Sequence, residues 1–172
     1  MKTSRIARRS SRLLPGLCAL ALPLVLPLAG WCASSSPKAE QIERGRYLVR
    51  VGGCNDCHTP GYGASGGKVP ERQWLTGDTL GYSGPWGTTY AANLRRQAAE
   101  MTQRQWLAMA QHQPMRPPMP WTSLQAMAPR DLAAVYQYLR WLGPQGDAAP
   151  RYLPPGTPPS GPAVVFPAPA GS

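Results

Sequence analysis

The sequence predicts a small all-α fold with long irregular loops. Three stretches carry start and stop signals for helices, a long stretch between them is rich in glycine and proline, and no parallel-strand pattern surrounds the one pair of closely spaced cysteines. The chain has 172 residues, of which about a hundred remain to fold between a leader and a proline-rich tail. We therefore predict one folded domain over residues 37–144.

The first 34 residues have the three parts of a secretory signal peptide. These are a basic start, an apolar run over 13–29, and small residues from Ala33 to Ser36. If the leader stayed uncleaved, the run over 13–33 would be just long enough to span a bilayer, although three prolines weaken it as a helix. We predict a periplasmic protein, with attachment to the outer face of the cytoplasmic membrane as the alternative.

Without the leader, the chain would have a smaller positive net charge than the whole sequence. It has 18 Lys and Arg against 8 Asp and Glu, a formal net charge of +10. Five of the basic residues and none of the acidic ones lie in the leader, which leaves 13 basic against 8 acidic residues. The remaining arginines are scattered and accompany no nucleic-acid-binding motif, so we expect no nucleic-acid partner. A mildly basic face would suit an acidic protein or an anionic membrane surface.

The first helix is predicted over residues 37–51. Ser36 is a suitable N-cap, Pro37 suits the first turn, and Gly52 and Gly53 end the helix. Its apolar residues do not form a regular stripe, so the prediction rests mainly on the end signals.

Residues 59–100 are predicted to be mostly loop, because glycine and proline recur throughout them. Loops of this length usually have a function. Four aromatic residues in it could wrap an apolar planar group, or could simply pack under surface loops. They are Trp74, Tyr82, Trp86 and Tyr90.

Helix signals return at Thr102, which with Gln105 forms a capping box, while Met101 and Trp106 occupy the positions of a hydrophobic staple. These signals predict a helix over 103–111. It is followed by a stretch that cannot be helical, because prolines remove backbone donors and exclude the helical region for the residues before them. We call residues 114–120, with the sequence Pro-Met-Arg-Pro-Pro-Met-Pro, the strap.

A last helix is predicted over residues 129–142. Pro129 suits its first turn, apolar residues follow at helical spacing, and Gly143 and Pro144 end it. Residues 145–172 are rich in proline and contain few apolar side chains, so we predict an extended, largely disordered tail.

The stretch Cys54-Asn55-Asp56-Cys57-His58 spells CxxCH, the signature for covalent attachment of a c-type haem. Two thiols one helical turn apart can each bond to one of the two vinyl groups of a porphyrin. The imidazole that follows is placed to ligate the iron. We predict one haem c attached through Cys54 and Cys57, with His58 as the first axial ligand.

Two other uses of a CxxC pair are disfavoured. A thioredoxin-like redox pair needs a βαβ context, which the surrounding sequence does not show. A structural zinc site needs four ligands. Outside the motif only His112 and two leader cysteines, Cys18 and Cys32, could contribute.

The order of elements over residues 39–144 resembles that of the class I c-type cytochromes: helix, CxxCH, long loop, short helix, Met-Pro strap and final helix. The resemblance implies a small helical fold around a covalent haem, with His and Met as axial ligands. Three stretches, Gly87–Leu94, Met119–Trp121 and Asp131–Leu139, are similar to the cytochrome c domains of membrane-bound alcohol, aldehyde and sugar dehydrogenases. Those relatives commonly carry several such domains in one chain, whereas this chain has one motif.

The same resemblance implies that the first and last helices cross. The crossing would bring Gly45 and either Tyr47 or Leu48 against Tyr138 and Leu139, where a glycine lets two backbones approach closely.

Family members often use a proline carbonyl to accept a hydrogen bond from the proximal imidazole and so fix its orientation. The candidates implied for this role are Pro70 and Pro60.

The predicted sixth ligand is Met119. A sulfur opposite His58 needs a stiff backbone to hold it, which a proline-flanked segment provides, and Met119 is followed directly by Pro120 as in the family's Met-Pro pattern. Met115 on the same strap and His112 are the weaker alternatives.

Nothing else in the sequence looks catalytic: there is no paired-carboxylate cluster, no Ser/His/Asp set and no phosphate-binding glycine loop. An iron ligated by both His and Met has no free position for substrate. We therefore predict an electron carrier rather than an enzyme, which passes single electrons between a dehydrogenase or quinol-linked donor and a downstream acceptor. Expected partners are a dehydrogenase subunit, an oxidase or another cytochrome.

The alternatives are a haem with an open sixth position, serving as a sensor or enzyme for gases or peroxide, and a scaffold subunit whose tail binds a partner.

Overall fold

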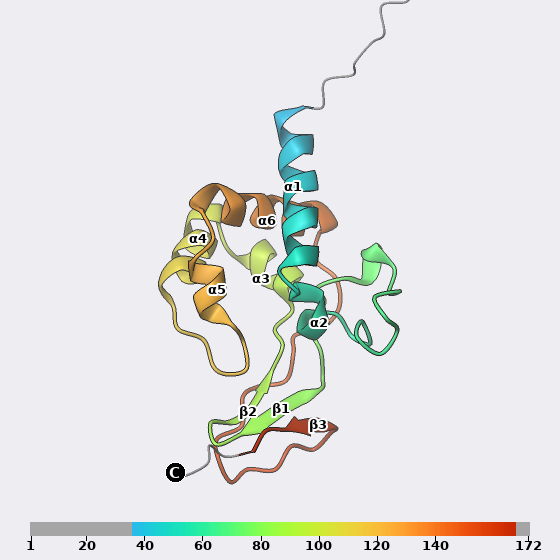
Figure 1. The fold of residues 1–172 in the computed structure, drawn as a ribbon, viewed down its shortest axis with the longest axis vertical. Coiled ribbons are helices and arrows are strands. Elements are labelled where there is room, and N and C mark those ends of the chain that lie inside the picture. Colours follow the sequence, from blue (N-terminus) through green and yellow to red (C-terminus); the bar gives the residue numbers. More distant parts are fainter. Residues whose placement is uncertain (1–35, 168–172) are drawn as a thin grey trace, which may run out of the picture. The chain divides into compact units, whose positions relative to one another are not determined.

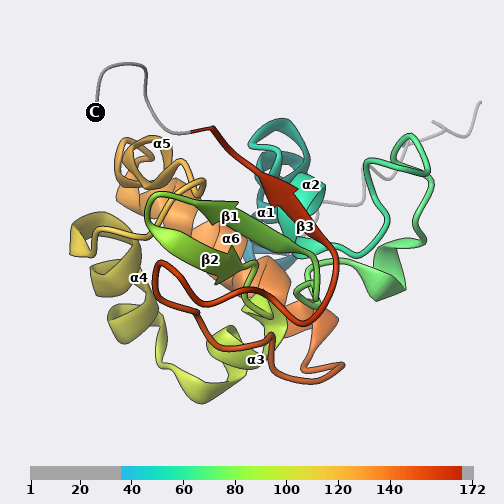
Figure 2. The same ribbon diagram turned by 90° about the horizontal axis from the view of Figure 1, so that it is seen from below.

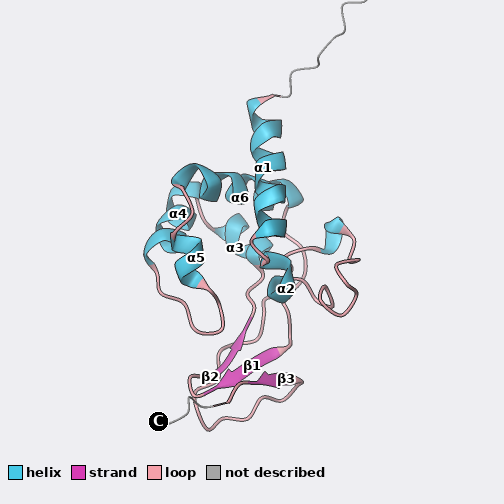
Figure 3. Cartoon of the chain, viewed as in Figure 1, coloured by secondary structure: helices cyan, strands magenta, loops and turns pink. Residues whose placement is uncertain are grey.

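The computed structural model describes residues 36–167, which belong to one compact unit. They form six α-helices, one 3-10 helix and a small three-stranded sheet, arranged with the helices around α1 and α6 and the sheet at the end away from the start of α1 (Figures 1 and 3). The elements are α1 (Pro37–Val51), α2 (Cys54–His58), η1 (Glu71–Gln73), β1 (Gly81–Gly84), β2 (Gly87–Tyr90), α3 (Leu94–Glu100), α4 (Gln103–His112), α5 (Trp121–Gln125), α6 (Pro129–Leu142) and β3 (Ala163–Val165). The fold is thus mostly helical, as predicted, but the sheet makes the all-α assignment incomplete.

The predicted signal segment, residues 1–34, lies outside the described residues. Within residues 36–167, no helix combines the length and the apolar character that crossing a membrane requires.

The three predicted helices are confirmed together with their end signals. The Ser36 side chain accepts a hydrogen bond from the Ala39 amide at the start of α1. The reciprocal capping box between Thr102 and Gln105 opens α4. Pro129 begins α6, and Gly143, with φ of 69°, ends it. Each of these signals acts within one turn of the chain, which is why sequence alone locates it.

The crossing of α1 and α6 forms the centre of the core. Gly45 faces α6 so closely that a Cβ atom there would lie 2.7 Å from both the carbonyl carbon of Ala134 and the Cβ of Tyr138. Glycine normally costs a helix interior about 1 kcal/mol relative to alanine, and the close helix contact offsets that cost. Leu48 is buried at the crossing, whereas Tyr47 is 56% exposed, so Leu48 supplies the neighbouring contact.

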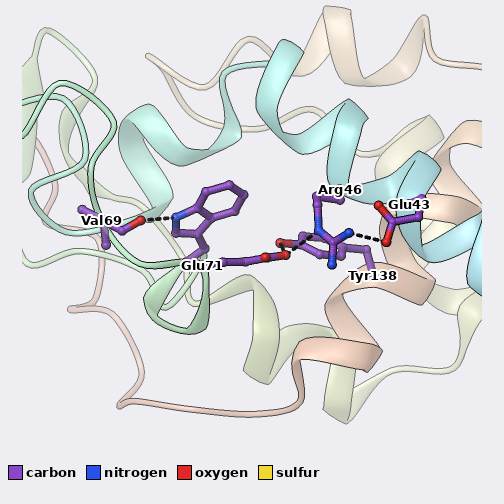
Figure 4. A network of polar contacts seen from close by, with 6 residues as sticks. Glu43, Arg46, Val69, Glu71 and Tyr138 are labelled. Atoms are coloured by element: carbon purple, nitrogen blue, oxygen red, sulfur yellow. Dashed lines mark hydrogen bonds and ion pairs between the residues drawn. The ribbon is translucent and has the colours of Figure 1, made fainter.

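A polar network joins α1, η1 and α6 (Figure 4). Arg46 pairs with Glu43 in its own helix, and its Nε donates to Glu71 Oε1 at 2.6 Å. The Tyr138 hydroxyl donates to the same oxygen at 2.8 Å. Burial tends to raise the pKa of Glu71, but the hydrogen bonds from Arg46 and Tyr138 outweigh it and lower this pKa. The carboxylate therefore stays ionised and attaches the 3-10 helix to the crossed helices.

The prediction that residues 59–100 are mostly loop is only partly right. The stretch contains η1, the antiparallel hairpin β1–β2 and the helix α3. The strands are four residues long, and Gly87 has φ of 95° at the hairpin turn. Strands this short have no alternating pattern to read, and their pairing partners are specified by distant residues.

The prediction of a disordered tail is wrong for residues 145–167. β3 pairs in parallel with β1, so that the sheet order is β2-β1-β3, and Leu153 forms an isolated bridge with Thr88 on the outer side of β2. The tail thus passes both edges of the hairpin (Figure 2). Prolines in it still serve as acceptors, since the Pro162 carbonyl binds the Gly81 amide at 2.9 Å. The few apolar side chains suffice because the hairpin supplies surface for them, as the contact of Phe166 with Trp86 shows.

We predict that Gly45→Ala destabilises the holoprotein by about 1–3 kcal/mol, because the helices must separate to admit the methyl group. Chemical denaturation measures this change in the free energy of unfolding. Gly63→Ala is the matched control: Gly63 is exposed, has no atom within 4 Å of the added Cβ, and should change stability by less than about 0.5 kcal/mol. Equal stability of the two variants would contradict the close crossing.

Candidate functional site

Helix α2 carries the whole CxxCH motif and follows α1 after two glycines. Gly53 adopts a left-handed conformation, with φ of 66°, and starts the short helix in a new direction. A helical conformation from Cys54 to His58 puts the two thiols one turn apart. The local glycines therefore set where the motif lies against α1.

Two buried polar side chains hold α2 in place. The Thr59 hydroxyl donates to Asn55 Oδ1 at 2.7 Å and accepts from the Leu75 amide at 2.8 Å. Asn55, Thr59 and Leu75 are each 1% exposed or less. Buried hydrogen bonds of this kind are strongly directional, so the short helix gains a fixed orientation that five residues alone would not provide.

His58 is buried and its ring orientation is fixed. Its Nδ1 lies 2.7 Å from the carbonyl oxygen of Ala92, just beyond β2. Burial lowers the pKa of His58, and the bond to Ala92 opposes this effect only in part. The ring is therefore neutral, with the proton on Nδ1 donated to the carbonyl and the lone pair on Nε2 available to a metal.

The residue that accepts the hydrogen bond from His58 differs from the one that the sequence led us to expect. A proline carbonyl was expected, from Pro70 or Pro60, but the carbonyl belongs to Ala92. Pro70 instead caps η1, where its carbonyl accepts from the Gln73 amide at 2.8 Å. A backbone carbonyl carries no signal in the sequence, so only the path of the chain after β2 could reveal it.

The two motif cysteines are free thiols and are partly buried. Burial raises the pKa of Cys54 to about 11, so this thiol is protonated at neutral pH and is poorly suited to thiol–disulfide exchange. Within residues 36–167, no three side chains of His, Cys, Asp or Glu gather closely enough to hold a metal ion. A neutral imidazole beside two unpaired thiols fits a covalently attached haem better than a redox pair or a zinc site.

Tyr82 on β1, one of the four aromatic residues that could wrap a planar group, lies next to Cys57 of the motif. Burial and the neighbouring Cys57 thiol, in that order, raise the pKa of Tyr82, so the phenol is neutral. Of the other aromatic residues expected near a planar group, Trp74 donates from Nε1 to the Val69 carbonyl and packs in the core, and Trp86 packs on Phe166. These two therefore serve the loop and the tail.

The three candidates for a sixth ligand lie between the starts of α4 and α5. Met119 and Met115 are partly buried on the strap, which is non-helical as predicted, while His112 is the exposed last residue of α4. The Met119 amide donates to the Arg116 carbonyl at 3.3 Å, and its own carbonyl accepts from the Trp121 amide at 2.8 Å. These bonds turn the strap into α5. One stretch of chain contacts both the strap and His58. Thr89 on β2 binds the Pro117 carbonyl of the strap, and Ala92, just after β2, binds His58.

Comparison with protein families gives a match to the cytochrome c family over residues 42–143. The chain belongs to the cytochrome c family. Members of this family bind haem c covalently and transfer electrons to redox partners, which agrees with the geometry of α2. The match identifies a class I c-type cytochrome domain. Neither a curated protein nor a solved structure matches this cytochrome significantly.

We predict that Cys54→Ser and Cys57→Ser each lower the yield of holoprotein, because one thioether bond is lost in either variant. The double variant should release its haem into acidified organic solvent, whereas the parent retains it. The spectrum of the reduced haem in alkaline pyridine counts the remaining thioether bonds. Full retention of haem by the double variant would show that attachment occurs elsewhere.

Proposed function

We propose that this cytochrome is an exported, single-haem electron carrier, which passes electrons between a dehydrogenase or quinol-linked donor and a downstream acceptor. The acceptor would be an oxidase or another cytochrome. The family membership supports the transfer of electrons. The single motif, Cys54 to His58, supports one haem per chain.

The observation that carries the proposal is the state of His58. Its ring is buried, neutral and held through Nδ1 by the Ala92 carbonyl, with both thiols on the same helix. When bound, haem c supplies a one-electron iron couple. The chain's part is to fix the imidazole and to exclude water from it, so that little rearranges when the charge at the site changes.

Met119 is our candidate for the second axial ligand. It is partly buried on a proline-flanked segment, and its own amide and carbonyl are both hydrogen-bonded, to the Arg116 carbonyl and the Trp121 amide. Prolines limit the conformations of such a segment, so little further entropy is lost in holding a sulfur in place. Thioether ligation favours reduced iron and so gives a higher reduction potential than a second histidine would.

We predict that Met119→Ala abolishes the far-red absorption band of the ferric sulfur–iron bond and lowers the midpoint potential. Met115→Ala and His112→Ala are the matched controls, and both should retain the band and the potential. Spectroscopy and a redox titration of the three holoproteins measure this. Loss of the band in a control instead would reassign the ligand. A parent that binds carbon monoxide at once on reduction, without a far-red band, would favour the open-site alternative.

Export should be visible in the mature protein. We predict that fractionation recovers the holoprotein outside the cytoplasm and that its mass lacks the leader, residues 1–34. A mass that retains these residues would indicate an uncleaved membrane anchor, and apoprotein confined to the cytoplasm would contradict export.

A further inference from the structure

The strap is attached by one side-chain contact to the sheet and by another to the tail beside it. The Thr89 hydroxyl, on β2, donates to the Pro117 carbonyl at 2.6 Å. The Arg116 guanidinium lies over the ring of Tyr152 in the tail, 4.0 Å from its centroid. These contacts fall on neighbouring strap residues, two or three positions before Met119.

The tail side of this attachment is itself fixed to the hairpin. The Tyr152 hydroxyl donates to the Trp86 carbonyl at 2.7 Å. Leu153 exchanges two backbone hydrogen bonds with Thr88, of 2.8 and 3.0 Å, next to Thr89. Beyond it, β3 closes the other edge of the hairpin (Figure 2). Tyr152 is therefore a fixed surface for Arg116 rather than a residue on a free tail.

The hairpin that binds the strap also leads into the residue that orients His58. Ala92, whose carbonyl accepts from the imidazole, follows Thr89 by three residues, and Tyr82 on the paired strand lies beside Cys57. One small sheet thus contacts both the motif, through Tyr82, and the strap, through Thr89.

We propose that Thr89 and Tyr152 are positioning residues, which hold the strap closed and thereby set how firmly Met119 ligates the iron. This inference rests on the proposed function, in which Met119 is the sixth ligand. It assigns a role to the tail that family membership does not supply, since the family match ends at residue 143.

The physical argument is one of populations. An external ligand binds at the sixth position only when the strap has opened far enough to take the Met119 sulfur from it, and it competes with that sulfur alone, so its apparent affinity equals its intrinsic affinity multiplied by the open fraction. A hydrogen bond or a cation–π contact that exists only in the closed state lowers that fraction. Contacts of these kinds are each expected to change the apparent affinity by about two- to tenfold.

The test is imidazole binding to the full-length ferric holoprotein. Thr89→Val removes the hydrogen bond, and Arg116→Gln removes the cation without altering the sheet. Each should raise the affinity for imidazole by about two- to tenfold and weaken the far-red band. Tyr152→Leu should resemble Arg116→Gln. Thr79→Val is the matched control at an exposed threonine, and should leave both readouts unchanged.

A double variant separates positioning from general loosening. In Met119→Ala no sulfur competes with imidazole, so adding Thr89→Val or Arg116→Gln should not raise the affinity further. An increase of the same size in that background would overturn the proposal, as would unchanged affinity in both single variants of a parent that shows the far-red band. A parent without that band overturns the proposed ligation instead, and the positioning role with it.

Discussion

The hydrogen bond between His58 and the Ala92 carbonyl is the contact on which the site depends. It fixes the orientation and the tautomer of the one imidazole in the motif, and so determines that Nε2 is the nitrogen left free. Its acceptor is held in turn by the chain around it, because the Ala91 carbonyl accepts from the Asp78 amide and the His58 carbonyl accepts from the Gly77 amide. The orientation of the imidazole is thus determined by the loop before β1 and by the end of β2, and not by α2 alone.

A second constraint acts at the end of α6. Arg95 is 4% exposed and donates to the carbonyls of Gly143 and Leu142 and to that of Arg72. Burial lowers its pKa, yet an arginine remains protonated at neutral pH. A buried cation at the C-terminal end of a helix is stabilised by the unpaired carbonyls there. It ties α3, which begins just after the acceptor of His58, to the crossed helices.

A feature could be predicted from the sequence when the residues that determine it lie within a few positions of one another, and was missed when they lie far apart. The ends of α1, α4 and α6 and the three residues Cys54, Cys57 and His58 follow from patterns within a few residues, and the helices were found as predicted. The hairpin and β3 were missed, because a four-residue strand is defined by its partner and Gly81 pairs with Ala163. Ala92 was missed because any residue could present that carbonyl. The ligand Met119 stays a prediction.

The crossing at Gly45 also bears on the order in which the chain acquires structure. The surface that α1 needs is Ala134 and Tyr138, far downstream, and the sheet next to Cys57 needs residues 163–165. During synthesis the motif leaves the ribosome before either partner, so α2 has no packed neighbour beyond α1 at that stage. The crossing with α6 and the pairing of β3 therefore complete the surroundings of α1 and of the sheet only after the last third of the chain is made, which leaves a period in which the two thiols lack these later elements.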